Sequence, residues 1–160
     1  SAEKRELVET LKSELTPEVI AEANLSQGRM LFQAVCAACH VLYGEGGKVG
    51  PDLTGSGRSS LEYLLENVVD PSAVVSADYL MSVVTLKDGR VISGVVAAQN
   101  QRTLTLRMLT EETTVEKTEI ENQVVSPVSM MPEGLLPALQ PEQVRDLIAY
   151  LMHPRQVSLP

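Results

Sequence analysis

Residues 36–40 read C-A-A-C-H and contain both cysteines of the 160-residue chain, Cys36 and Cys39, with His40 directly after the second. Two thiols and an imidazole at this spacing suit three kinds of site: structural zinc, a thioredoxin-like redox pair, and covalent attachment of haem c. In haem attachment the thiols add across the two vinyl groups of the porphyrin, and the adjacent histidine binds the iron. These sites need different surroundings, so the rest of the chain distinguishes between them.

The surroundings favour haem attachment. Structural zinc normally takes four ligands, and with two cysteines and two histidines in the chain the site would need the remote His153 as well. A thioredoxin-like pair is expected in a βαβ unit, whereas a helical pattern precedes this motif and a glycine-rich loop follows it. Aromatic residues make up only 3% of the chain, which is compatible with a macrocycle filling part of the core. We therefore predict one covalently attached haem c, tethered by Cys36 and Cys39, with His40 on the iron.

A low-spin electron carrier needs a second axial ligand, and thioether sulfur is a soft, neutral ligand that favours ferrous iron. Four of the six methionines fit core positions on helices or strands: Met30, Met81, Met108 and Met152. The other two lie in the loop S-M-M-P-E-G-L, residues 129–135. Met131 precedes Pro132, which holds its neighbour extended, so we predict Met131 rather than Met130 as the distal ligand. Two alternatives stay open: that both are apolar loop contacts, and that His153 binds the iron instead.

Helical spacing of apolar residues surrounds this chemistry on both sides. We expect helices over residues 7–15, 17–25, 26–39, 59–70 and 141–152. Ser26 is a candidate N-cap of the helix that ends at the cysteines. Residues 44–57 are too rich in glycine and proline for regular structure.

From Tyr79 the apolar residues alternate, which is typical of strands. Two β-rich runs flank the Asp88-Gly89 pair, a strong hairpin signal, and two more strands follow up to residue 125. This β insertion weakly resembles small Sm-like barrels. Its glutamates make RNA binding unfavourable and leave a docking or solvent-shielding role: Glu111, Glu112, Glu116, Glu119 and Glu121.

The motifs together resemble a class I cytochrome c. The matching segments are G-R-M-L-F, C-A-A-C-H, G-P-D-L, M-P and the final D-L-I-A-Y-L, across residues 26–78 and 126–153. The chain is more closely similar to the haem-binding domain family of planctomycete-type and verrucomicrobial bacteria, in G-x-V-G-P-D-L-T, in the β segment and in M-P-E-G-L. Residues 1–25 lie outside these motifs, and the β segment departs from ordinary class I domains.

The resemblance implies that Pro51 shields the proximal side of the haem, its carbonyl accepting a hydrogen bond from the far nitrogen of His40. Such a bond would fix the tautomer and increase the basicity of the ligand. The resemblance also implies that the first core helix packs on the last, through Gly28, Phe32, Leu147 and Tyr150. In such proteins the domain often forms the C-terminal end of a much larger extracytoplasmic chain.

We therefore expect a mainly α fold, a class I cytochrome c helical core around one haem with an inserted antiparallel β-sheet or small barrel. The expected parts are an N-terminal helical leader or connector (1–25), the cytochrome c core (26–78 and 126–153), the β insertion (79–125) and a C-terminal tail (154–160).

Charge and hydropathy limit which partners and which location are possible. The net charge is −8 and the 13 basic residues do not cluster, which excludes a nucleic-acid partner and favours a redox protein with a basic docking surface. No stretch approaches the roughly 20 apolar residues of a membrane span. The chain begins S-A-E-K-R-E-L, so we expect a mature or excised product from which the export signal or upstream region is absent. Haem c chemistry on free thiols predicts an extracytoplasmic, periplasmic location.

The predicted function is one-electron transfer by a monohaem c-type cytochrome with His40 and Met131 as axial ligands. We expect no enzymatic activity, because both axial positions are filled and no base or nucleophile surrounds an open site. One alternative is a haem-based gas or redox sensor, in which Met131 is displaced by a small ligand. Another is the electron-accepting C-terminal domain of a larger dehydrogenase, with residues 1–25 as the connector.

Overall fold

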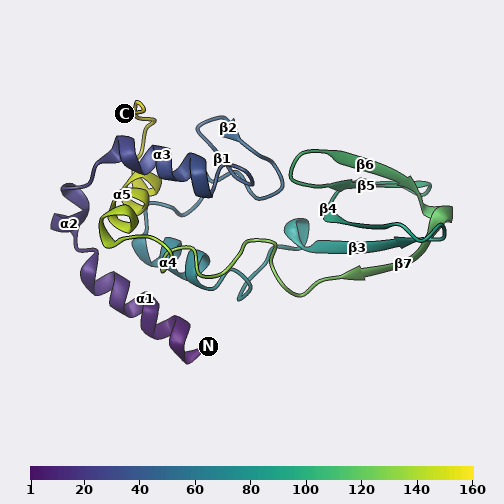
Figure 1. The fold of residues 1–160 in the computed structure, drawn as a ribbon, viewed down its shortest axis with the longest axis horizontal. Coiled ribbons are helices and arrows are strands. Elements are labelled where there is room, and N and C mark those ends of the chain that lie inside the picture. Colours follow the sequence, from purple (N-terminus) through teal and green to yellow (C-terminus); the bar gives the residue numbers. More distant parts are fainter.

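Five α-helices form the lobe that carries both termini, at the left of Figure 1. The computed structural model describes residues 1–160. The helices are α1 (Ala2–Glu14), α2 (Pro17–Ala21), α3 (Leu25–Val35), α4 (Leu61–Val69) and α5 (Pro141–Met152). None of them combines the length and the apolar character needed to cross a membrane. A polar side chain caps the first turn of each of the first four: Ser1, Thr16, Asn24 and Ser60.

The start of α3 differs from the prediction by two residues. Asn24, not Ser26, is the N-cap, and its Oδ1 accepts a hydrogen bond from the Gln27 amide at 3.1 Å. The Asn24 amide in turn donates to Asp146 Oδ1 of α5 at 3.0 Å. A contact between distant parts of the chain therefore decides where this helix begins.

Helix α3 crosses α5 in close contact at Gly28. A Cβ atom at residue 28 would lie 2.1 Å from the Asp146 carbonyl oxygen, so the backbones approach this closely only because residue 28 is glycine. The rings of Phe32 and Tyr150 lie beside this crossing with their centroids 5.8 Å apart. Leu147 belongs to the same buried cluster. The contact that the family resemblance implied between the first core helix and the last is present.

The second lobe is an antiparallel sheet, at the right of Figure 1. Its strands are β3 (Met81–Leu86), β4 (Val91–Gln99), β5 (Thr103–Arg107), β6 (Glu112–Glu116) and β7 (Ile120–Val125). Their order in the sheet is β6-β5-β4-β3-β7, so β3 pairs with both its sequence neighbour β4 and the last strand. The β3–β4 hairpin turns at Asp88-Gly89, where Gly89 adopts a φ of +92°. The sheet has a hydrophobic core of its own, formed by Val84, Leu86, Leu104, Leu106 and Val115.

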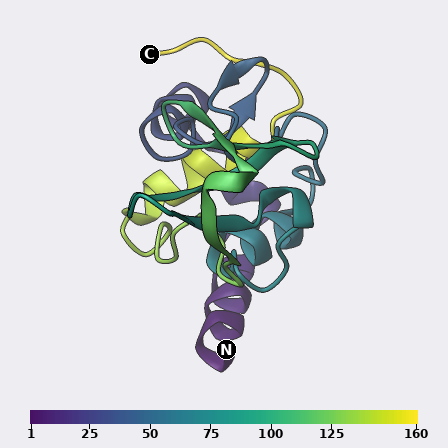
Figure 2. The same ribbon diagram turned by 90° about the vertical axis from the view of Figure 1, so that its right-hand side faces the viewer.

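The expectation of a mainly α fold with a class I cytochrome c core is wrong. Helices hold 35% of the residues and strands 22%, and the five-stranded sheet stands beside the helices as a separate lobe. Figure 2, viewed from the sheet side, shows the sheet in front of α5, with α1 projecting beyond it. The reason is that the alternating apolar side chains of the β segment pack on one another and form a second core. The sheet also has one strand more than the four predicted, because a 3₁₀ turn at Lys117–Glu119 divides the last predicted run and β7 follows it.

A short hairpin, β1 (Val41–Leu42) and β2 (Glu45–Gly46), follows the C-A-A-C-H motif directly. The loop beyond it reaches the sheet, because Arg107 of β5 donates from Nη1 to the Lys48 carbonyl at 3.2 Å. The segment after His40 therefore lies where the two lobes meet.

Candidate haem site

The C-A-A-C-H motif forms a tight turn at the end of α3. The amide of Cys36 donates to the Phe32 carbonyl at 2.8 Å, which completes the last helical turn. The amides of Cys39 and His40 then both donate to the Cys36 carbonyl, at 3.1 and 3.0 Å. Two cysteines and a histidine are thus held on one turn of backbone whose shape the end of the helix determines.

Both cysteines are free thiols and are partly buried. Burial raises the pKa of the Cys36 thiol to about 12, with a smaller contribution from the neighbouring Cys39. Burial also raises the pKa of Cys39 above its ordinary value. A nucleophilic redox cysteine needs a lowered pKa, so this environment does not suit a thioredoxin-like pair. Covalent haem attachment needs two reduced cysteines that are not paired with each other, and both cysteines are free here.

One ring nitrogen of His40 is already engaged. Its Nδ1 lies 2.8 Å from the Pro51 carbonyl oxygen, which can only accept, so Nδ1 carries a hydrogen and, in the neutral ring, the lone pair is on Nε2. The ring also lies close to the backbone of Gly50, where a Cβ atom would come within 2.8 Å of His40 Cε1. The loop therefore holds the imidazole in one tautomer and one orientation, as a metal ligand requires.

The glycine-rich loop wraps closely around the turn. Gly46 adopts a φ of +128°, and a Cβ atom there would lie 1.9 Å from the His40 carbonyl oxygen. The glycine and proline content of residues 44–57 predicted an irregular loop but not this close contact. Its signal in the sequence is the run G-E-G-G-K-V-G itself.

The far end of this loop is tied to the end of α5 through a buried cation. Arg58 donates from Nη1 to the carbonyls of Leu151 and His153 at 2.9 and 2.5 Å, and its guanidinium stacks 4.9 Å from the centre of the Tyr43 ring. The Tyr43 hydroxyl also donates to the His153 carbonyl. The sequence contained no signal for this arrangement, because nothing marks Arg58 as buried.

The alternatives involving His153 gain no support from its surroundings. Its Nδ1 lies 2.6 Å from the Arg155 carbonyl oxygen, a contact within its own turn. No group of three or more histidine, cysteine, aspartate or glutamate side chains is arranged to hold a metal ion, so the four ligands of a structural zinc site are not assembled.

The predicted distal ligand lies on a separate loop, which is anchored to the turn after α4. The Met131 amide donates to Ser129 Oγ at 3.1 Å, and the Ser129 amide donates to Ser72 Oγ at 3.1 Å. Met130 and Met131 are both partly buried. No hydrogen bond joins this loop to the C-A-A-C-H turn. The structure thus brings Cys36, Cys39, His40 and Pro51 together and holds Met131 on an independent support.

Comparison with known families gives a match over residues 23–85, less than half of the chain, to the family described as cytochrome c oxidase, cbb3-type, subunit III. The match supports a c-type cytochrome. It includes the C-A-A-C-H turn and Pro51 and ends before the loop that carries Met131. The same match supports haem c as the cofactor and electron transfer as the activity. A comparison with curated proteins gave no match. The free thiols and the oriented imidazole of this site fit that cofactor.

Proposed function

We propose that this chain is a monohaem c-type cytochrome that transfers single electrons, with haem tethered by Cys36 and Cys39 and ligated by His40 and Met131. The observation that carries the proposal is the hydrogen bond between His40 Nδ1 and the Pro51 carbonyl, within a turn that also presents two free thiols. Bound haem iron would supply the one-electron couple. Domains of the matched kind are typically electron carriers, which supports a function without catalysis of its own.

Each residue of the site has a defined task in this proposal. Two thioethers made by Cys36 and Cys39 would prevent loss of the cofactor, and the Nε2 lone pair of His40 would bind the iron. The Pro51 carbonyl makes that imidazole a stronger ligand for iron, because it accepts a hydrogen bond from the Nδ1–H of the same ring. Met131 would complete the coordination with a neutral sulfur and so raise the reduction potential.

We further propose that residues 26–78 and 126–153 hold the cofactor, while residues 79–125 shield it or dock a partner. The net charge of −8 suits a redox partner with a basic docking surface. A periplasmic location is proposed as well, since domains of this kind are usually extracytoplasmic. Residues 1–25 then form a leader or connector, and residues 154–160 a tail.

A haem-based sensor is the second candidate function. The observation in its favour is that the loop carrying Met131 shares no hydrogen bond with the C-A-A-C-H turn, so the sulfur could leave without disturbing the proximal side. In a sensor, carbon monoxide would bind the ferrous wild-type protein readily. In an electron carrier, intact methionine ligation would exclude it.

The test is expression in cells that mature c-type cytochromes, followed by acid-acetone extraction and mass measurement. We expect the haem to stay with the polypeptide and the mass to equal the chain plus one haem. The matched variant Cys36→Ser, Cys39→Ser is expected to lose its haem in the extraction. A wild-type mass equal to the bare polypeptide would exclude the proposed function.

A further inference from the structure

Lys4, in the first turn of α1, connects three distant parts of the chain. Its Nζ lies 2.7 Å from Asp70 Oδ1, at the end of α4, and 2.6 Å from Glu133 Oε1. The side chains of Lys4 and Asp70 are each about a quarter exposed, at 26% and 27%. These ion pairs raise the pKa of Lys4 and lower that of Asp70, so both groups are charged at neutral pH.

Glu133 follows the predicted ligand Met131 by two residues, so Lys4 acts on the loop that presents the sulfur. On the other side of Met131, Ser129 anchors the loop to Ser72. Immediately after Glu133, Gly134 turns the chain with a φ of +79°. Met131 therefore lies between two anchors: a hydrogen bond to the turn after α4, and an ion pair to α1.

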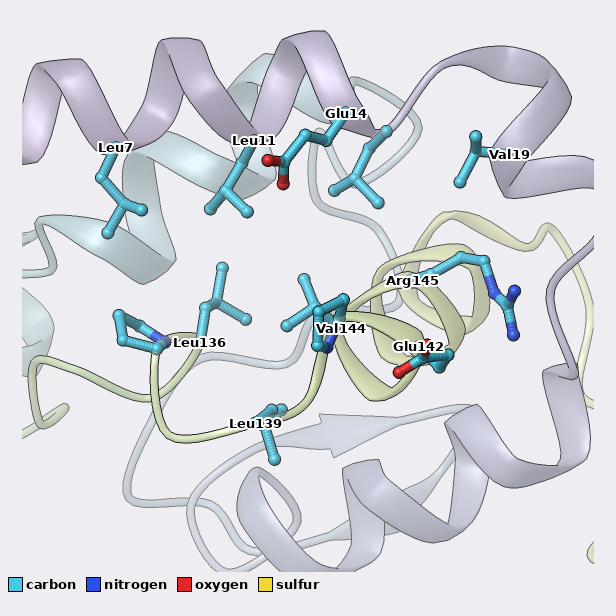
Figure 3. Close-up of a pocket in the computed structure, with 12 residues that line it drawn as sticks. Leu7, Leu11, Glu14, Val19, Leu136, Leu139, Glu142, Val144 and Arg145 are labelled. Carbon is cyan, nitrogen blue, oxygen red and sulfur yellow. The ribbon is translucent and has the colours of Figure 1, made fainter.

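Apolar packing joins α1 to the helical core mainly beyond its first turn, through Val8 and Leu15. A cavity of about 500 Å³ lies between α1 and the segment that leads into α5, and Figure 3 shows Leu7 and Leu11 pointing into it from one side and Leu136 from the other. Val8 is the only buried residue of α1. The ion pair between Lys4 and Glu133 joins the first turn of α1 to the loop.

We propose that Lys4 is a positioning residue for the distal ligand, clamping α1 across residues 129–135 so that Met131 stays on the iron. The inference rests on the proposed function, since it takes Met131 as the ligand. Partly exposed ion pairs are weakened by salt, so the clamp loosens as ionic strength rises. When it loosens, the sulfur leaves more often and an added ligand competes better for its position.

The test is a titration of the ferric protein with imidazole, which displaces the methionine from the iron. Loss of the far-red sulfur-to-iron band reports the displacement. Lys4→Met removes the charge and keeps the apolar stem. We expect imidazole to bind this variant about three- to fivefold more tightly than the wild type, the upper part of the range for partly exposed ion pairs. Lys4→Arg should have the imidazole affinity of the wild type. Glu133→Gln should raise the imidazole affinity as Lys4→Met does. The double variant Lys4→Met, Glu133→Gln should show no further increase.

Lys12→Met is the matched control. Lys12 Nζ pairs with Glu9 and Glu62 at 3.2 and 2.9 Å, so it too ties α1 to α4, but it touches no residue of the loop. We expect its imidazole affinity to stay within about twofold of wild type. If Lys4→Met behaves like Lys12→Met while the wild type shows the far-red band, the clamp is overturned and the proposed function stands. If the wild type lacks the band, methionine ligation is contradicted, and the proposed role of Lys4 is contradicted as well.

Discussion

At the scale of single residues, the proximal side of the site is defined by contacts that leave His40 little freedom. The Pro51 carbonyl engages Nδ1, and the backbone of Gly50 lies against the ring where any side chain would collide with it. The distal side differs, because Met130 and Met131 are adjacent and both partly buried. Substitution of each methionine in turn therefore tests which sulfur binds the iron.

Met131→Ala is expected to remove the far-red sulfur-to-iron band and to let carbon monoxide bind the ferrous protein. The potential should fall markedly within the roughly 0.8 V range that axial ligands control, because neutral sulfur stabilises ferrous iron. Absorption spectra and a redox titration check these three effects. Met130→Ala is the control and should keep the band, the closed iron and the potential of the wild type. The reverse pattern would move the ligand by one residue.

Arg58 is a buried cation whose hydrogen bonds go to carbonyl groups rather than to a carboxylate. Arg58→Met keeps much of the apolar stem but removes the donor to the Leu151 carbonyl, whereas the His153 carbonyl keeps the Tyr43 hydroxyl. We expect the free energy of unfolding to fall by about 1.5–3 kcal/mol, the range for hydrogen bonds to charged groups. Denaturant unfolding measures this loss. The exposed Arg155, changed to Met, should alter stability by no more than about 0.5 kcal/mol; equal losses would contradict a structural role for Arg58.

At the scale of elements, the crossing of α3 and α5 aligns the turn that presents His40, because that turn is the direct continuation of α3. The crossing depends on Gly28, on the Phe32–Tyr150 ring pair, and on the Asp146 carboxylate that receives the Asn24 amide. Small changes at this crossing should therefore reach the haem site.

Gly28→Ala is expected to destabilise the protein by about 1–3 kcal/mol, because the added methyl group would collide with the Asp146 carbonyl and force the helices apart. Thermal unfolding followed by far-ultraviolet circular dichroism measures the loss. Gly55→Ala is a suitable control, since a Cβ atom there has no neighbour within 4 Å. A stability of Gly28→Ala equal to that of the control would show that α3 and α5 do not cross as closely as described.

At the scale of the whole molecule, charge is the dominant surface property. The net charge of −8 should accelerate encounter with a basic redox partner at low salt, since long-range attraction raises association rates. Stopped-flow electron transfer to a basic acceptor protein is expected to slow steadily as ionic strength rises. An acidic acceptor of similar potential provides the control. Rates that are independent of salt with both acceptors would mean that the charge serves solubility alone.

Several exposed or half-buried carboxylates have hydrogen-bond partners that lower their pKa: Asp52, Asp70, Asp88 and Glu116. A folded pKa below the unfolded value gives stability that is present above the unfolded pKa, near 4, and is lost as the pH falls through the folded one. We expect the melting temperature to be nearly constant from about pH 7 to 5 and to fall below about pH 4. In Asp88→Asn the melting temperature should decrease less on acidification than in the wild type. A melting temperature that rises on acidification would contradict the lowered pKa values of these carboxylates.

The sequence by itself determined the features whose information is local. The chemistry of C-A-A-C-H depends on five consecutive residues. The helices follow from the spacing of apolar residues, and the β3–β4 hairpin follows from the Asp88-Gly89 pair. The tertiary structure decided what depends on distant contacts: the start of α3 at Asn24, the fifth strand β7, and the separate core that makes the sheet a lobe of its own. Lys4, Asp70 and Glu133 are up to 129 positions apart, and no periodicity reports that they meet. The periodicity of a sequence shows which face of a helix or strand is apolar. Only the packed structure shows which residues that face contacts, and which residues pair with a charged side chain beside it.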